Sequence, residues 1–259
     1  MIIDTHCHLD DSRYRDDLDE VLKRARENGV KKFIIPGADP KDLKRAYALS
    51  QKYEDIYFAV GVHPYHAMDY NREFLERFIR DKRCVAVGEC GLDYYRLPKD
   101  IEEKEREKRL QKEIFRDQIE LSIEYNLPLI VHIREASSDS FNILNSYKDK
   151  IRGVLHCYNA NPILLNLSKN FYYGIGGVLT FKNAKKLIEI YPKIPQNRLL
   201  TETDAPYLTP HPYRGKRNEP SYTRLIAKKM AELSKISKEE IENITTQNAL
   251  KLFSKIEIA

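Results

Sequence analysis

The sequence has no tryptophan, and its four cysteines are scattered without a CxxC pair. A disulfide framework is therefore not expected at this length and composition. No apolar run reaches the roughly 20 residues that a helix needs to span a bilayer. The N-terminus, at residues 1–6, lacks the basic start and the apolar stretch of a signal peptide. We therefore expect a cytoplasmic protein without a membrane segment, acting as a monomer.

The sequence also lacks a linker rich in Gly, Pro or Ser, an internal repeat and a low-complexity tract. A chain of 259 residues with 42% hydrophobic content can bury one large core. Because a barrel of roughly 250 residues can form one domain, we predict a single domain over residues 1–259. The net charge of +5 is compatible with an anionic substrate but too small to identify one.

Short apolar runs alternate with longer amphipathic segments along the chain. The predicted strands are 2–6, 32–36, 56–62, 84–89, 129–132, 153–156, 171–175 and 199–203. The predicted helices are 16–28, 41–52, 72–80, 102–125, 138–147, 162–169, 184–191, 221–233 and 238–253. This alternation indicates an α/β fold with parallel strands and right-handed crossovers. Eight such strands favour a single TIM-type (β/α)8 barrel with a C-terminal helix. A distorted form of the barrel is compatible with the same pattern. A doubly wound open sheet is the alternative, disfavoured because no GxGxxG follows the first strand.

The first predicted strand ends in His6-Cys7-His8. Side chains two apart on a strand point to the same side, so both imidazoles can face one metal while Cys7 points away. Taken alone, an HxH pattern is equally consistent with two histidines satisfied by hydrogen bonds. Asp4 and Asp10 flank the pair and are candidate acceptors for the ring N–H groups.

The same arrangement recurs at other strand ends, where an apolar run is followed by a residue that can ligate a metal. These residues are Glu89, His132, His156 and Asp204. Because strand C-termini in a barrel converge on one face, they are expected to meet His6 and His8 there. Buried charges need partners or metals, so this recurrence predicts a metal site.

The predicted ligands are four imidazoles and two carboxylates, which suit Zn²⁺, Mn²⁺ or another first-row ion, with Mg²⁺ an alternative for a partly hydrated site. Six ligands exceed the set of one catalytic zinc and so suggest two divalent ions. Glu89, central in chain order, is the natural bridging carboxylate. Two ions held about 3.5–4 Å apart suit phosphodiester hydrolysis. We assign catalytic roles to Glu89 and Asp204, with Asp204 as the base and Glu202 as its substitute.

Several further residues have both a functional and a structural interpretation. His63 follows the third strand as a substrate contact, whereas His66 fits an exposed loop. Arg134 can reach a phosphate or form a structural salt bridge. Tyr94 and Tyr95 can stack on bases, and core packing is an equal alternative for at least one of them.

A cationic loop follows the strand that leads to Asp204. Its residues Arg214, Lys216 and Arg217 are predicted to bind the phosphates of a nucleic acid. The alternative is that Arg214 or Arg217 pairs with Glu219 or a nearby helix and only orders the loop.

The sequence resembles the TatD family of metal-dependent deoxyribonucleases, within the amidohydrolase-like barrels. The resemblance runs through DTHCHLD (4–10), GVHP (61–64), VGECGLDYY (87–95), VHIREA (131–136), LHCY (155–158), TETDAPYL (201–208) and RGKRNEP (214–220). It implies a (β/α) barrel, two divalent metals and hydrolysis of DNA phosphodiesters, often as a 3′→5′ exonuclease, with RNA as an alternative substrate. The family's ligands fall on the six residues named above, and its substrate-contacting histidine on His63. One departure is Asn159-Ala160, where the family more often has Ser-Gly.

Four other functional classes, three catalytic and one non-catalytic, share parts of this pattern. Amidohydrolases that cleave C–N bonds usually bridge their metals with a carboxylated lysine, whereas Glu89 takes that position here. A phosphoesterase for small esters or nucleotides, or an esterase for aminoacyl-tRNA, can use the same ligands. A non-catalytic metal-binding scaffold is the remaining class, and the complete ligand set argues against it.

Overall fold

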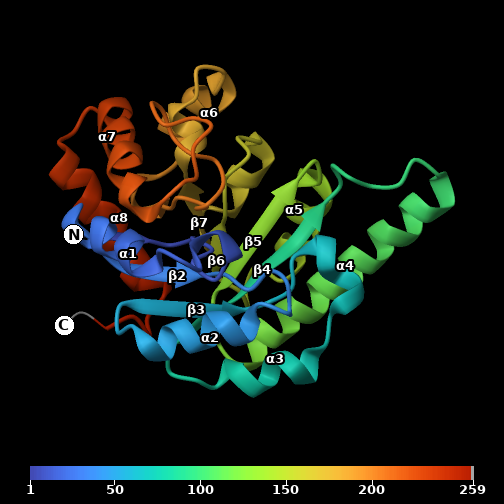
Figure 1. The fold of residues 1–259 in the computed structure, drawn as a ribbon. Coiled ribbons are helices and arrows are strands. Elements are labelled where there is room, and N and C mark those ends of the chain that lie inside the picture. Colours follow the sequence, from blue (N-terminus) through green and yellow to red (C-terminus); the bar gives the residue numbers. More distant parts are fainter. Residues whose placement is uncertain (258–259) are drawn as a thin grey trace.

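The computed structural model describes residues 1–257, so the last two positions of the predicted domain lie outside the described residues. Eight parallel strands form one sheet in chain order, which confirms the predicted TIM-type barrel (Figure 1). The strands are β1 (Ile2–Asp4), β2 (Val30–Ile35), β3 (Ile56–Val60), β4 (Cys84–Asp93), β5 (Leu129–Arg134), β6 (Gly153–Leu155), β7 (Phe171–Ile175) and β8 (Leu199–Thr201).

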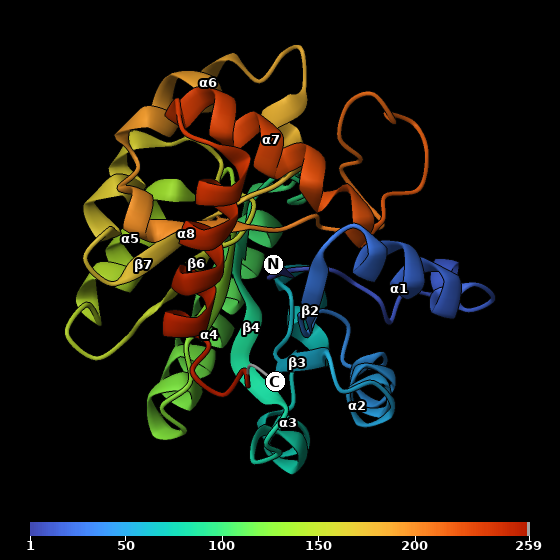
Figure 2. The same ribbon diagram turned by 90° about the vertical axis from the view of Figure 1, so that its left-hand side faces the viewer.

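Helices follow the strands and surround the sheet (Figure 2). They are α1 (Leu18–Glu27), α2 (Leu43–Lys52), α3 (Arg72–Ile79), α4 (Ile101–Glu124), α5 (Ser137–Ser146), α6 (Lys185–Ile190), α7 (Thr223–Ser234) and α8 (Lys238–Leu252). Ser237 caps α8, since its side chain accepts from Glu240 N. Within residues 1–257, no helix has both the length and the apolar character that crossing a membrane requires.

Several predicted elements differ from the structure. The segment predicted as a helix at 162–169 forms a 3-10 helix, Pro162–Leu167. Strand β4 continues past the predicted end at residue 89 to Asp93, because it pairs with β5 as far as Arg134. In contrast, β1, β6 and β8 stop before His6, His156 and Asp204, which lie in the segments that follow these strands.

The barrel closes between β8 and β1 through few hydrogen bonds. Thr5 donates from its backbone N and from Oγ1 to Thr201 O, at 3.2 and 3.0 Å. Beyond the strands, Cys7 forms an isolated parallel bridge with Ala205. Two further backbone hydrogen bonds join the segments that carry predicted ligands: Asp204 N donates to His6 O at 2.9 Å, and His8 N donates to Ala205 O at 2.7 Å.

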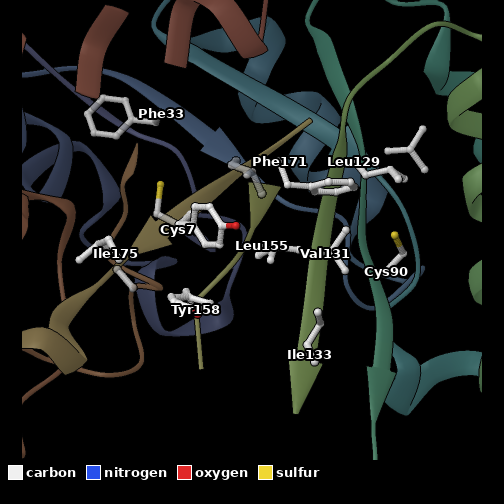
Figure 3. Close-up of a cluster of buried hydrophobic side chains, with 14 of the residues drawn as sticks. Cys7, Phe33, Cys90, Leu129, Val131, Ile133, Leu155, Tyr158, Phe171 and Ile175 are labelled. Atoms are coloured by element: carbon white, nitrogen blue, oxygen red, sulfur yellow. The ribbon is translucent and has the colours of Figure 1, made fainter. Parts of the chain in front are cut away.

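The hydrophobic core has two parts. The inner part fills the barrel with side chains such as Ile34, Ile130 and Leu200, and the end of α8 contributes Leu252 and Phe253 to it. The outer part lies between strands and helices and contains the side chains that Figure 3 labels, among them Cys7. Cys7 thus packs outward, as the alternation predicts. Because α8 packs into the amino ends of the strands, the carboxyl ends remain open for a site.

Candidate metal centre

The six predicted ligands meet at the carboxyl ends of the strands. One set of ligand atoms comprises His6 Nε2, His8 Nε2 and Glu89 Oε2, which all lie within 4.8 Å of one another. A second set comprises Glu89, His132 and His156 under the same limit. Asp204 Oδ1 lies 3.4 Å from His8 Nε2 and 3.7 Å from His6 Nε2, so it joins the first set.

Glu89 belongs to both sets through different oxygens. Its Oε2 lies 3.4 Å from His6 Nε2, whereas its Oε1 lies 2.8 Å from His132 Nδ1 and 3.9 Å from His156 Nε2. A carboxylate that presents one oxygen to each set of imidazoles has the geometry of a bridge between two cations.

Close packing of β4 places Glu89. Gly88 has a φ of +146°, and a Cβ there would lie 2.3 Å from Ile130 O, so a side chain does not fit. Gly88 O accepts from Gly37 N at 2.8 Å, and Glu89 N donates to Gly37 O at 2.5 Å. These contacts fix the backbone on both sides of the peptide that carries the carboxylate.

Two further carboxylates contact the ring nitrogens of His132 and His156 that face away from Glu89. Asp93 Oδ2 lies 2.9 Å from His132 Nε2, and Glu202 Oε1 lies 2.9 Å from His156 Nδ1. Such contacts fix the ring orientation of a ligating histidine. The sequence prediction did not include Asp93, and it proposed Glu202 only as a substitute base. Asp93 could have been found from its position at the end of β4, but only if the strand had been predicted to continue to residue 93.

Asp4 has a different role from the one predicted. Instead of accepting from an imidazole, its buried carboxylate accepts from Thr203 Oγ1 at 2.6 Å, Thr203 N at 3.0 Å and His6 N at 3.3 Å. Burial raises the pKa of Asp4 to about 7, against the lowering effect of these hydrogen bonds. Asp4 therefore ties the segment carrying His6 to the segment carrying Asp204.

The carboxylates of the centre have no permanently charged partner. Glu89, Asp93 and Glu202 are buried, at 4%, 1% and 1% exposure. Within residues 1–257, the ion pairs of these three and of Asp204 are with histidines alone, not with Lys or Arg. Buried carboxylates need compensating charge. The donor set therefore fits divalent cations, which would supply that charge.

The pKa values of the centre point the same way. Burial opposes ionisation of Glu89, but the rings of His6 and His132 hold its pKa well below the usual range. Burial also opposes protonation of His156, yet Glu202 above all raises the pKa of this imidazole to about 10. The buried carboxylates thus favour a positive charge between them, which a divalent cation would supply.

His63, the predicted substrate contact, lies at the edge of the centre. Its Nε2 is 3.7 Å from Glu89 Oε1, and its Nδ1 accepts from Tyr65 N at 3.0 Å. Burial lowers the pKa of His63 to about 3, so the ring is neutral. Because Nδ1 accepts, the proton resides on Nε2, which points a donor into the site. His66, expected in an exposed loop, instead lies half-buried within the 3-10 helix Pro64–Asp69, with its Nδ1 3.9 Å from carboxylate oxygens of Asp39 and Asp69.

A cavity of about 780 Å³ adjoins the metal centre. It reaches His132, His156 and Asp204 at one side, and this volume suits a small-molecule or nucleotide-sized ligand. Its wall includes the predicted Arg134 and, unforeseen, Lys185 and Lys186 at the start of α6. The sequence signal was the Lys-Lys pair itself, which without the fold is an ordinary surface feature.

Asn159 and Ala160, the departure from the family pattern, also line this cavity. Ala160 has a φ of +60°, a left-handed conformation that glycine adopts more readily than alanine. Asn159 donates to Ser137 Oγ at 3.0 Å. The Ser-Gly more usual in the family would therefore fit the same turn while changing the polar surface beside the substrate.

Ion pairs fix part of the cationic loop to neighbouring residues. Arg217 pairs with Asp17 at 2.5 Å and with Glu219 at 3.3 Å, and Glu219 also pairs with Arg24 of α1. Arg214 donates to Thr209 O at 3.0 Å and lies over the ring of Phe181. Lys216 is exposed and has no ion pair within residues 1–257. Phosphate binding by the three cations stays a prediction.

Asn218 in this loop was missed by the sequence prediction. It is fully buried, and its Nδ2 donates to Thr203 O at 2.9 Å and to Tyr207 O at 2.6 Å. These two carbonyls flank Asp204 in the chain. Asn218 therefore anchors the turn that carries a predicted ligand.

The model of the family described as TatD related DNase matches residues 3–254. The chain belongs to the TatD family. The uncharacterized metal-dependent hydrolase YabD of Bacillus subtilis is 43% identical, over 98% of this chain and 99% of its own length. The 3′-5′ ssDNA/RNA exonuclease TatD of Erwinia tasmaniensis is 34% identical over 98% of this chain and its full length.

A solved structure agrees with this assignment. YJJV, a TatD homologue from Escherichia coli, has a TM-score of 0.86 and 30% identity to this chain, over 98% of both chains. The TatD-family chain described here is therefore related throughout its length to metal-dependent hydrolases, and it carries residue groups that can hold a metal.

Proposed function

We propose that this TatD-family protein hydrolyses phosphodiester bonds of single-stranded nucleic acid as a 3′→5′ exonuclease, using two divalent ions. The observation that carries the proposal is the division of Glu89 between two sets of imidazoles, through Oε2 and Oε1. One ion would be held by His6, His8, Glu89 and Asp204, and the other by Glu89, His132 and His156. The name of the Erwinia tasmaniensis relative supports nucleic acid as the substrate.

When bound, Mg²⁺, Mn²⁺ or Zn²⁺ would activate water and neutralise charge on the phosphate. The protein's own groups complete the reaction. Asp204 lies beside His6 and His8, where its carboxylate can accept the proton of the attacking water. His63 donates from Nε2 to a phosphate oxygen, and Arg134 on the cavity wall offers a bidentate donor to the next one.

The test is a matrix of metals and substrates. Protein freed of metal with a chelator is reloaded with Mg²⁺, Mn²⁺ or Zn²⁺ and assayed on single-stranded DNA, duplex DNA, RNA and a small phosphodiester. Substrates labelled at either end reveal the polarity of digestion. We expect mononucleotide release from the 3′ end of single strands. Cleavage of small esters alone, with intact oligonucleotides, would contradict the assignment to nucleic acid.

A further inference from the structure

Three tyrosines stand out because their rings are exposed. The chain has 17 tyrosines, and those with more than a third of their surface exposed are Tyr65, Tyr95 and Tyr207, at 40%, 52% and 47%. No phenylalanine is exposed to that degree. An exposed aromatic ring forgoes the burial that usually makes it stabilising, so a group of them indicates a binding surface.

All three tyrosines border the metal centre, two through their rings and Tyr95 through its backbone. The Tyr65 ring centroid is 4.7 Å from that of His63, and the Tyr207 ring is 5.8 Å from that of His8. Tyr95 N donates to Asp93 Oδ1 at 2.9 Å, and Asp93 in turn contacts His132. The three tyrosines thus contact different residues of one centre, namely His63, His8 and Asp93.

The neighbouring Tyr94 shows the opposite arrangement. Its hydroxyl donates to Asp139 Oδ2 at 2.8 Å, and its ring is half-buried against the core. Of the two tyrosines that the sequence singled out for stacking, Tyr95 is the more exposed, and the hydroxyl of Tyr94 is already engaged by Asp139.

A guanidinium lies over each exposed ring. Arg134 is 3.6 Å from the Tyr95 ring centroid, Arg13 is 4.3 Å from that of Tyr207, and Arg96 is 5.4 Å from that of Tyr65. Arg13 is bound to Asp11. In the part of the chain that the structure describes, Arg96 and Arg134 form no ion pair, so their charge is available to an anion.

We propose that Tyr65, Tyr95 and Tyr207 are stacking platforms for unpaired bases, and that Arg96 and Arg134 hold the phosphates between those bases. The inference rests on the proposed function, because it identifies how that site would recognise a single-stranded substrate. Every base has a stackable face, so such platforms tolerate any sequence, whereas a duplex keeps its bases away from them. The platforms therefore select single strands without selecting sequence.

The test measures binding separately from hydrolysis. Fluorescence anisotropy with labelled oligothymidylate, in the presence of chelator, gives the affinity of the wild type and of Tyr65→Ala, Tyr95→Ala and Tyr207→Ala. We expect each variant to bind about tenfold more weakly, which equals about 1.4 kcal/mol and lies within the usual range for one stacked base. Tyr95→Phe, which keeps the ring, should bind like the wild type.

The matched control is Tyr125→Ala. The guanidinium of Arg80 lies over the Tyr125 ring, 4.9 Å from its centroid. Tyr125 caps the C-terminal end of α4, which leads into the start of β5 and lies away from the centre. A second control is an abasic strand of equal length, which has phosphates but no bases. The three variants should bind the abasic strand as the wild type does.

Equal losses on the normal and the abasic strand, or an equal loss in Tyr125→Ala, would overturn the stacking proposal. The proposed function fails in a different way. If the wild type binds oligothymidylate through these rings but cleaves no phosphodiester with any metal, then the platforms stand and the nuclease assignment falls.

Discussion

Glu89 is the residue on which both proposed metal positions depend. Replacing it by Gln keeps the shape of the side chain but removes the charge that lies within 3.9 Å of five imidazoles. We expect Glu89→Gln to remain folded with little activity and to retain fewer than two ions per chain, as measured by elemental analysis. Metal at 100 times its Kd should stabilise the wild type by about 2.7 kcal/mol, and this gain should shrink in the variant. Near-normal turnover at saturating metal would refute the bridging role.

Asp204 is expected to differ from Glu89 because its ion pairs within residues 1–257 all use Oδ1, so we assign proton transfer to Oδ2. Asp204→Asn should keep most of the metal affinity yet lose roughly 10²–10⁴-fold in turnover, the usual contribution of a general base. The measurement compares kcat with metal occupancy in the same samples. A fall in kcat that merely follows occupancy would assign the base role elsewhere, and Glu202→Gln is then the variant to examine.

Asp93 acts on the metal centre through His132. Asp93→Asn should lower metal affinity or activity about 10–100-fold, because the ring of His132 loses the acceptor that orients it. A metal titration followed by calorimetry reports the change. Asp149→Asn, at an exposed position in a loop, is the control and should titrate like the wild type. Unchanged affinity and unchanged kcat in Asp93→Asn would remove Asp93 from the site.

At the scale of elements, the cationic loop is joined to α1 by ion pairs. Arg217→Ala should lower the free energy of unfolding by about 0.5–1 kcal/mol, the usual size for a surface pair, and Asp17→Asn should lower it similarly. A double-mutant cycle by chemical denaturation should show that the two losses are not additive. Additive losses would show that the pair contributes nothing to holding the loop.

Within the same loop, the cation that anchors the loop and the cation that we expect to bind a phosphate are different residues. Lys216, exposed and unpaired among the described residues, is the cation most available to a strand. Lys216→Ala should flatten the dependence of log affinity on log salt by roughly 0.7, the effect of one phosphate contact on a single strand. Hydrolysis of a small phosphodiester should change little. An unchanged slope would mean that this lysine does not contact the strand.

At the scale of the whole molecule, α8 closes the end of the barrel opposite the metal centre. Phe253 is fully buried in the inner core, so Phe253→Ala should cost about 3–5 kcal/mol. Thermal unfolding measures the loss, and Lys251→Ala on the exposed side of the same helix is the control. Because the centre lies at the other end, kcat per folded molecule should be preserved. A selective loss of kcat would show coupling between the two ends.

The sequence alone determined the fold class and which polar side chains gather at one end of the barrel. Alternating apolar and amphipathic segments report the local repeat of strand and helix, and polar residues at strand ends report what a barrel gathers on one face. The meeting of the six predicted ligands could therefore be predicted before their contacts were known, because parallel strands bring their carboxyl ends together whatever the loops do.

Only the tertiary structure decided which partners those residues meet. That Glu89 faces two sets of imidazoles, that Asp4 holds Thr203 rather than a histidine, and that Arg217 pairs with Asp17 all depend on segments far apart in the chain. The exposure of Tyr95 and the burial of Tyr94 depend on how β4 continues beyond Glu89. Local sequence fixes the periodicity of a segment, but a side chain's contacts are fixed by which distant segments pack against it.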